Sequence, residues 1–335
     1  MDLSDYQTLF LPAIEARLST DLHTHLDNAY PELREAIFYH FGVTDQQASM
    51  KGKRIRPLLV LLIADALGIE WQSVLPAASA VEMLHNFSLI HDDIEDHSAT
   101  RRGKLTVWKR WGVEKAVNIG DVLYSMAMQT IQSGELPFHA ETILESARLF
   151  ANTAFDLLQG QQMDMDFEGN ATIDPQNYLK MIAGKTGALL AYCCEVSAVL
   201  ADRERDERDY LRTVGSNLGL SFQIYDDWLG IWGDEQQTGK PQYCDLLEHK
   251  ISYPVLLGLI GNSRFREIWL EEKCGSQEAQ RMTELLVESG IDAEVLAKSE
   301  EYNTIAITAL DEVSGKRDTK NALQKLMKDL VRRKK

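Results

Sequence analysis

The chain has 335 residues, of which 44% are hydrophobic and 26% charged, an ordinary globular composition that allows a large core. Its formal net charge is −16, which argues against a protein that binds nucleic acid by neutralising phosphates. The same charge excludes an anionic substrate unless metal ions or local Lys and Arg side chains reverse the field.

The cysteine count and the apolar runs bear on where the protein works. Four cysteines without metal-ligand spacing indicate free thiols in a reducing compartment. The start, Met-Asp-Leu-Ser-Asp, lacks the basic region of a secretory signal, and the longest apolar run, Pro57–Ala64, is far short of a membrane span. We therefore expect a cytoplasmic protein with no transmembrane segment.

Helical periodicity dominates the chain, and strand signals are scarce. Helices are expected over residues 5–26, 31–41, 57–67, 73–96, 105–133, 138–163 and 206–230, with another opened by Asp174-Pro175. No linker interrupts the chain before residue 260. We expect an all-α fold: one domain over residues 1–335, a large helical bundle with a central active-site cavity. Residues 262–335 carry no chemical motif and are expected to form peripheral helices.

A basic stretch precedes the predicted helix at Pro57–Leu67. It contains Lys51, Lys53, Arg54 and Arg56. Basic groups near a helix N-terminus oppose the helix dipole, and a bound anion would relieve that conflict. A solvated basic loop is the alternative interpretation.

The stretch from His85 to Gly103 contains the strongest chemical pattern. Its acids are Asp92, Asp93, Glu95 and Asp96. Asp92 and Asp96 would be neighbours on a helix, and clustered carboxylates repel unless a cation lies between them. Mg2+ takes one or two carboxylates plus substrate phosphates. Arg101 and Arg102 follow directly and could hold those phosphates in bidentate fashion. The pattern predicts a diphosphate site.

A second acidic pair, Asp226–Asp227, lies in a similar helical setting. Either motif alone could be a solvated acidic face. Two motifs that each close an apolar helical stretch could instead face one another across a cleft and hold several metal ions.

The order and spacing of six short motifs resemble the trans-isoprenyl diphosphate synthases, also called E-polyprenyl synthases, over residues 52–254. The motifs are Gly52–Pro57, His85–Gly103, Gly120-Asp121, Gly160–Asp164, Lys185–Gly187 and Asp226–Lys240. The resemblance implies the isoprenoid synthase fold, a homodimer, and Mg2+ as cofactor, with three ions bound together with substrate. It implies two substrates, isopentenyl diphosphate and an allylic diphosphate (dimethylallyl, geranyl or farnesyl).

The resemblance also assigns roles to individual residues. It places isopentenyl diphosphate on Lys53, Arg56, His85 and Arg102. It places the allylic diphosphate on Arg101, Lys185, Thr186, Gln223, Lys240 and Lys250, and metal ions on Asp92, Asp96 and Asp226. Asp92, Asp96, Asp226, Lys185 and Arg101 would assist ionisation of the allylic substrate, whose cation the isopentenyl double bond attacks. Gln161 and Asp164 would line the cavity.

The sequence departs from the family pattern at Gly230, where many members have a fifth-position Asp. Asp226 is the principal ligand of that motif in the family, so we expect metal binding to survive, though weakened. The stretch before Lys250 is also less basic than usual.

Product length is predicted from Phe87 and Ser88, which lie five and four residues before Asp92. In the family these positions largely set the floor under the growing chain. One aromatic and one small residue, without an insertion between Asp93 and Asp96, resemble the geranylgeranyl type. The prediction is a C20 product, with C15 (farnesyl) or C25 as alternatives.

Two other functions stay open. A terpene cyclase on the same scaffold needs no second diphosphate site, so the presence of Lys53, Arg56, His85 and Arg102 counts against it. A non-catalytic partner subunit of another prenyl synthase would be expected to lack the acidic motifs, and this chain keeps both.

Overall fold

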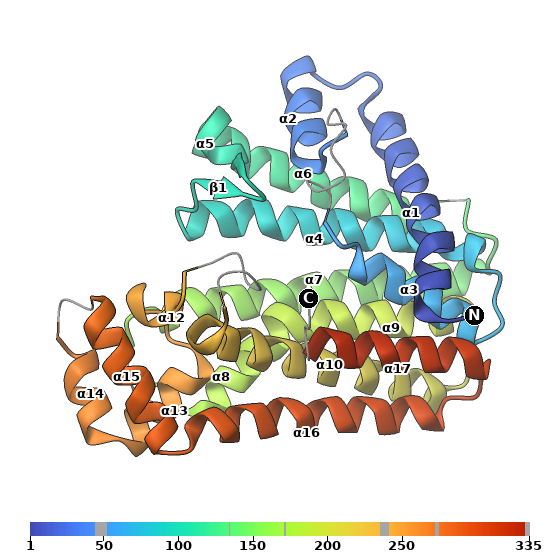
Figure 1. The fold of residues 1–335 in the computed structure, drawn as a ribbon. Coiled ribbons are helices and arrows are strands. Elements are labelled where there is room, and N and C mark those ends of the chain that lie inside the picture. Colours follow the sequence, from blue (N-terminus) through green and yellow to red (C-terminus); the bar gives the residue numbers. More distant parts are fainter. Residues whose placement is uncertain (44–51, 134, 171, 235–240, 272–274, 332–335) are drawn as a thin grey trace. The chain divides into compact units, whose positions relative to one another are not determined.

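The protein is almost entirely helical in the computed structural model, which describes residues 1–43, 52–133, 135–170, 172–234, 241–271 and 275–331 (Figure 1). The only strands in these ranges are β1 (Thr100–Arg101) and β2 (Lys104–Leu105), which pair as a short antiparallel ladder. The prediction of an all-α fold is therefore confirmed.

The chain forms two compact units, each assembled from separate stretches of sequence. Unit 1 comprises residues 1–154, 192–209 and 314–323, and unit 2 comprises residues 155–191, 210–313 and 324–335. The expected single domain over the whole chain stays a prediction.

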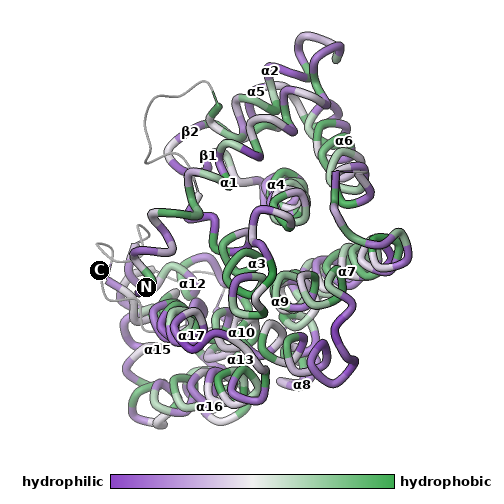
Figure 2. Tube along the Cα trace, turned by 90° about the vertical axis from the view of Figure 1, so that its right-hand side faces the viewer, coloured by the Kyte–Doolittle hydropathy of each residue, from purple (hydrophilic) through white to green (hydrophobic). Residues whose placement is uncertain are grey.

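Unit 1 is built around apolar helices. In chain order they are α1 (Leu3–Leu26), α2 (Pro31–Phe41), α3 (Ile55–Ala66), the 3-10 turn η2 (Trp71–Val74), α4 (Leu75–Glu95), α5 (Val107–Trp111) and α6 (Val113–Ile131). The first part of α7 (Ala140–Phe167), most of α9 (Ala188–Leu200) and the first residues of α10 (Arg205–Trp232) and α17 (Arg317–Val331) also belong to the unit. Helix α4 packs against α3 and α6. Helix α3 is mostly hydrophobic in Figure 2, and every residue from Pro57 to Ala64 is buried.

Unit 1 is closed by residues from the far end of the sequence. Asp65, near the end of α3, accepts hydrogen bonds from Thr319 at 2.5 Å and from Lys316 at 2.8 Å. The Tyr6 hydroxyl lies 2.7 Å from the Thr319 hydroxyl, and the Lys316 amide donates to the Ala66 carbonyl at 2.8 Å. These contacts satisfy polar groups at the end of α3.

Unit 2 contains the remaining helices. They are α8 (Pro175–Ile182), the π-helical turn η3 (Ala183–Gly187), α10 (Arg205–Trp232), α12 (Cys244–Leu247), α13 (Tyr253–Gly261), α14 (Ser263–Trp269), α15 (Ser276–Glu288), α16 (Ile291–Glu312) and the second half of α17 (Arg317–Val331). Its core includes the fully buried Leu256, Phe265 and Leu286. The tail at residues 332–335 lies outside the described residues.

Several predicted helix boundaries were wrong, as three examples show. The helix expected from residue 73 begins at Leu75, because residues 71–74 form the 3-10 turn η2. The helix expected from Pro57 begins at Ile55. The helix expected over residues 105–133 is divided at Gly112, whose φ of 93° suits glycine and interrupts the helix.

One helical stretch, residues 175–200, is long and apolar enough to cross a membrane by length and composition alone. In the structure 72% of its most apolar window is buried inside the protein, as in the core helix of a water-soluble fold. No other such stretch occurs among the described residues.

Candidate active site

In the basic loop before α3, some side chains lie at the surface and others point into the interior. Lys53 is exposed, whereas Arg54 keeps only 4% of its surface exposed and points into unit 1. Arg56 is half-buried, and its guanidinium donates a hydrogen bond to Nε2 of His85 on α4 at 3.1 Å. Two residues predicted to bind the same diphosphate, Arg56 and His85, are therefore in direct contact.

Two histidines near this loop are neutral. Burial, reinforced by the charge of Arg102, lowers the pKa of His40 to about 3. Burial and the neighbouring Arg56 hold the pKa of His85 well below its usual value. A neutral His85 can accept the Arg56 hydrogen bond, so it orients the guanidinium without adding charge.

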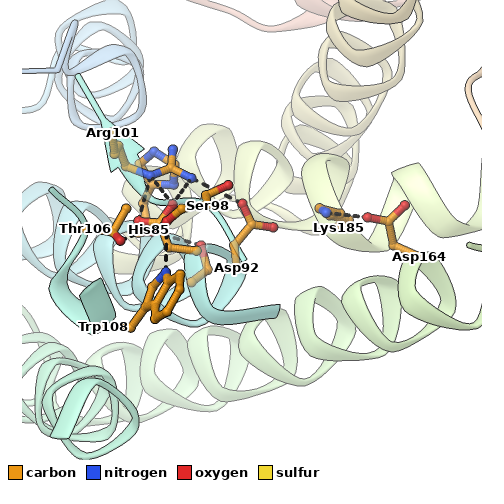
Figure 3. Close-up of polar contacts among 10 residues, drawn as sticks. His85, Asp92, Ser98, Arg101, Thr106, Trp108, Asp164 and Lys185 are labelled. Carbon is orange, nitrogen blue, oxygen red and sulfur yellow. Dashed lines mark hydrogen bonds and ion pairs between the residues drawn. The ribbon is translucent and has the colours of Figure 1, made fainter. Parts of the chain in front are cut away.

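The first acidic motif lies at the end of α4, where Asp96 is the C-cap residue. Asp92 is half-buried and Asp96 exposed, so both carboxylates can reach a ligand. Asp93 instead is buried, and both of its oxygens accept from Nε of Arg101 at 2.8 and 3.0 Å. Burial, opposed by Arg101, raises the pKa of Asp93 to about 6. Asp93 thus holds Arg101 3.4 Å from Asp92 (Figure 3).

Arg101 and Arg102 are presented by the β1–β2 hairpin. The Ser98 carbonyl accepts hydrogen bonds from the Thr106 hydroxyl and the Trp108 indole, both at 2.8 Å, which fixes the base of the hairpin (Figure 3). Gly52 leaves room for Arg102, because a Cβ at position 52 would lie 2.8 Å from its Nη2. Sequence reasoning missed Thr106 and Trp108, which carry no charge signal.

Phe87, the predicted chain-length residue, is 4% exposed on α4. Its ring lies 5.5 Å from Tyr124 on α6 and 4.7 Å from His91, measured between centroids. The Ser88 hydroxyl donates to the His85 carbonyl at 2.8 Å, so this small side chain stays close to its own helix. Tyr124 is a neighbour that the sequence pattern did not reveal.

The second acidic motif lies within α10 of unit 2, and its two carboxylates differ. Asp226 is half-buried. Asp227 is buried and accepts from the Tyr178 hydroxyl at 2.6 Å, the Gln223 amide at 3.1 Å and the Tyr253 backbone N–H at 3.2 Å. Burial raises the pKa of Asp227 to about 7, although Lys250 and these donors oppose the rise. Asp227 therefore orders side chains around Asp226, and Tyr178 was not anticipated.

Lys185 and Thr186 lie in the π-helical turn η3, not in a regular helix as expected. Lys185 donates to Asp164 of α7 at 2.5 Å (Figure 3), and Thr186 donates to Gln223 at 3.0 Å. The turn packs tightly against α7, because a Cβ at Gly160 would lie 2.1 Å from the Lys185 backbone nitrogen. Single π-helical turns are frequent at functional sites. The structure thus joins Lys185, Thr186, Gln223 and Asp164 into one polar cluster.

Gly230 stands where many family members have Asp. The carboxylate of Asp245, from another helix, lies against this glycine. A Cβ at Gly230 would lie 2.3 Å from Oδ2 of Asp245, which is buried on α12. Lys250 lies nearby: loss of hydration would lower its pKa, but Asp245 and then Asp227 outweigh this and raise it. Lys240, the other predicted lysine, lies outside the described residues.

The predicted metal ligands fit an ion that binds together with a substrate. Among the described residues, no three His, Cys, Asp or Glu side chains are arranged to enclose a metal ion. Mg2+ does not need such a cage, since it keeps several waters and binds one or two carboxylates plus substrate phosphates. Asp92 with Asp96, one helical turn apart, and Asp226 supply hard oxygen donors of this kind. That the two motifs face one another stays a prediction, as do the assigned roles of the site residues.

An almost entirely helical fold places Arg101 beside Asp92 and Asp93 and Lys250 near Asp227, which is the arrangement expected of a helical protein that binds diphosphates. The polyprenyl synthetase family model matches residues 41–287. The (2E,6E)-farnesyl diphosphate synthase of Mycobacterium tuberculosis is 38% identical over 269 residues, covering 78% of this chain and 74% of that protein. The geranylgeranyl diphosphate synthase of Saccharolobus solfataricus is 32% identical over 99% of both chains.

A polyprenyl synthetase structure from Streptomyces coelicolor superposes with a TM-score of 0.86 at 31% identity, covering 98% of each chain. The chain belongs to the polyprenyl synthetase family. It is a trans-prenyl diphosphate synthase, and its family uses divalent metal ions with isopentenyl and allylic diphosphates as substrates.

Proposed function

We propose that the protein is a geranylgeranyl diphosphate synthase, which extends dimethylallyl, geranyl or farnesyl diphosphate with isopentenyl diphosphate to a C20 product. The observation that supports a C20 product is the size and packing of the side chains at positions 87 and 88. Phe87 is a buried ring, packed against Tyr124 and His91, whereas Ser88 is small and its hydroxyl bonds to the His85 carbonyl. At 1.5 Å per residue these positions lie about 6–7.5 Å below Asp92 along α4.

In the proposed reaction, unit 1 binds isopentenyl diphosphate. The exposed ammonium of Lys53 and the guanidinium groups of Arg56 and Arg102 provide charge-assisted hydrogen bonds to its diphosphate. Neutral His85 accepts from Arg56 and fixes its orientation. Because Lys53, Arg56 and Arg102 are themselves positively charged, isopentenyl diphosphate would bind to them without a metal ion.

The allylic diphosphate is assigned to Lys185, Thr186, Gln223, Lys240 and Lys250, together with Arg101. Asp164 holds the Lys185 ammonium, and Asp227 holds the Gln223 amide, so both donors are preorganised. Mg2+, three ions in the proposal, would be held by Asp92, Asp96 and Asp226 and would neutralise the allylic diphosphate so that it can depart.

The bond changes balance within the two substrates. The allylic C–O bond breaks with its electron pair on the leaving diphosphate, and the isopentenyl double bond forms the new C–C bond. The resulting cation loses a proton to the released diphosphate. Donors fixed before the reaction stabilise the negative charge that develops on the leaving oxygen. An apolar surrounding keeps water from trapping the cation as an alcohol.

We also propose that the protein is a cytoplasmic homodimer. Helix α7 carries large apolar side chains that are strongly exposed, Leu144 (52%), Phe155 (63%) and Leu158 (44%). Their spacings of eleven and three residues place them along one side of the helix. Exposed apolar surface of this kind marks interaction sites. Light scattering on the purified protein, which should give twice the 37.9 kDa chain mass, tests the dimer.

Product analysis tests the proposed function. Purified protein is incubated with Mg2+, isopentenyl diphosphate and each of the three allylic diphosphates, and products are read by mass spectrometry. Geranylgeranyl diphosphate is expected from all three, while farnesyl diphosphate or a C25 product as the end point would correct the length. Hydrocarbon formed without isopentenyl diphosphate would instead identify a cyclase. Absence of turnover by the protein alone would favour the partner-subunit alternative.

Replacing the predicted floor tests the product length directly. Phe87→Ala removes the ring beside Tyr124 and should lengthen the product by at least one isoprene unit. Phe38→Ala, at another buried ring of unit 1, is the matched control and should leave the product unchanged. If the product of Phe87→Ala has wild-type length, Phe87 is not the floor.

A further inference from the structure

A chain of buried polar contacts lies behind the basic loop of unit 1. Arg54 donates to Glu15 of α1 and to Glu82 of α4, both at 2.6 Å. The same Glu82 oxygen accepts from the Asn86 amide at 3.0 Å, and the Asn86 carbonyl oxygen lies 3.1 Å from Nε2 of His40 on α2. Five side chains thus connect the loop to three helices.

Because this network is buried, each of its polar groups needs a hydrogen-bond partner inside the protein. Arg54 is 4% exposed, Glu82 2% and Asn86 0%. A charge so deeply buried is tolerated only when paired and hydrogen-bonded. Burial would lower the pKa of Arg54, but Glu82 and Glu15 outweigh it and raise that pKa, so Arg54 is a firmly held cation. Its place inside the protein is therefore strongly determined.

The backbone at Arg54 shows what the network holds. Its φ of 50° and ψ of 36° are left-handed, a conformation that residues other than glycine adopt only when their surroundings enforce it. This local reversal turns Arg54 inward while Lys53 stays exposed and Arg56 reaches His85. If Arg54 lost its partners, the backbone could relax, and Lys53 and Arg56 would change direction.

We infer that Arg54 and Glu82 are positioning residues that hold Lys53 and Arg56 ready for the diphosphate of isopentenyl diphosphate, without touching it. The inference rests on the proposed function of Lys53 and Arg56. Within this basic stretch, Lys53 and Arg56 would bind the diphosphate, whereas Arg54 would fix the conformation of the loop.

Glu82 allows positioning to be distinguished from simple electrostatics. Besides its contact with Arg54, its negative charge favours the protonated forms of Arg56 and Arg102. A negative charge beside an anion site weakens anion binding through the field alone. Removing the charge of Glu82 should therefore tighten diphosphate binding if Glu82 acts only through its electric field. The same change should weaken binding if Glu82 holds the loop in position.

The test is Glu82→Gln in the full-length protein, compared with wild type by steady-state kinetics and by calorimetric binding of isopentenyl diphosphate. We expect the KM and Kd for isopentenyl diphosphate to rise about tenfold or more, since charge-assisted hydrogen bonds to Arg54 are weakened. The allylic KM should change less than about twofold, because Lys185 is held by Asp164 and Arg101 by Asp93, neither of which belongs to this network. An unchanged or lower isopentenyl KM would overturn the inference.

A matched control variant distinguishes an effect on the position of the loop from a loss of stability of α3. Arg203 donates to the Leu67 carbonyl at the opposite end of α3, so Arg203→Met loosens the same helix away from the loop. It should lower Tm without changing the isopentenyl KM. Should Glu82→Gln fail to fold, Arg54→Lys decides, because lysine keeps the charge but lacks the guanidinium geometry that spans two carboxylates. Arg54→Lys should raise the same KM, and a wild-type value would refute the inference.

Failure of the proposed function has a different signature. If the wild-type protein condenses no isopentenyl diphosphate yet binds it by calorimetry, the function fails and the effect of Glu82→Gln on Kd still tests the inference. If wild type turns over and Glu82→Gln keeps its isopentenyl KM and Kd, only the inference fails.

Discussion

The basic loop of unit 1 and the second acidic motif of unit 2 differ in the charges they gather. The loop and hairpin of unit 1 carry Lys53, Arg54, Arg56, Arg101 and Arg102, of which Arg54 and Arg101 are paired with carboxylates. Burial lowers the pKa of Arg56 and of Arg102 there. Unit 2 gathers carboxylates around two lysines: Asp164, Asp226, Asp227 and Asp245 with Lys185 and Lys250. Burial raises the pKa of Asp227 to about 7, and the surrounding carboxylates raise that of Lys250.

The contrast indicates two ways of binding a diphosphate. Lys53, Arg56 and Arg102 lose mutual repulsion when an anion binds between them, so the proposed isopentenyl diphosphate site needs no added cation. The carboxylates of Asp92 and Asp96 in unit 1 and of Asp226 in unit 2 repel an anion until cations are added, so the proposed allylic site depends on metal ions. Sensitivity to metal removal should therefore differ between the two substrates.

The largest effect is expected at the metal ligands. Asp226→Ala, and equally Asp92→Ala, should lower kcat/KM by about 10³-fold while the circular dichroism spectrum is retained, because each removes a predicted ligand of the ions that neutralise the leaving group. Excess EDTA should abolish wild-type turnover but leave calorimetric binding of isopentenyl diphosphate nearly intact. Full activity in EDTA would refute the contrast drawn above.

A pair of substitutions should separate the two substrates. Arg56→Ala should raise the KM for isopentenyl diphosphate by about 30–100-fold, the loss of a charge-assisted contact of about 2–3 kcal/mol, with little change for the allylic substrate. Lys185→Ala should show the reverse preference. Equal effects of both variants on both substrates would mean that the clusters do not work separately.

One of the two neutral histidines near the basic loop, His40, predicts a pH dependence of stability. His40 has a folded pKa of about 3, whereas an unfolded chain would bind its proton below about pH 6.5. The unfolded state therefore takes up a proton between these values and the folded state does not, so stability falls as pH decreases through 6.5. From pH 7.5 to 5.0 the share of His40 is at most about 2 kcal/mol. His40→Gln should show a flatter dependence in urea unfolding.

The smallest effect is expected at Gly230. Alanine favours a helix over glycine by about 1 kcal/mol, but its Cβ would meet the Asp245 carboxylate, and crowding of this kind costs about 1–3 kcal/mol. Gly230→Ala should therefore lower Tm by a few degrees. Gly230→Ala combined with Asp245→Gly should recover part of the loss; no recovery would show that the crowding lies elsewhere.

Much of the fold and part of the site could be predicted from the sequence, for identifiable reasons. Helices follow from local periodicity, and the spacing of Asp92 and Asp96 from the helical repeat. The inward direction of Arg54 could not be predicted, because it depends on Glu15 and Glu82, which are distant in sequence. The approach of Asp245 to Gly230 depends equally on how two helices pack.

Local sequence carries only one sign of the π-helical turn. Lys185 and Thr186 were expected in a regular helix, and the composition of Ala183–Gly187 does not distinguish the two. The turn accompanies a close approach of α7, for which Gly160 is the visible sign, since any side chain there would collide with the Lys185 backbone. A glycine interrupting a helical run was the available signal.

The hydrogen bonds of Asp65 bear on the order in which the protein can be completed during synthesis. Asp65 is translated early, but Lys316 and Thr319, which bond to it, emerge from the ribosome some 250 residues later. Domains generally fold as their residues become available, starting from the N-terminus. Unit 1 therefore waits for nearly the whole chain, with one end of α3 lacking these bonds, and translation that stops before residue 316 leaves it incomplete.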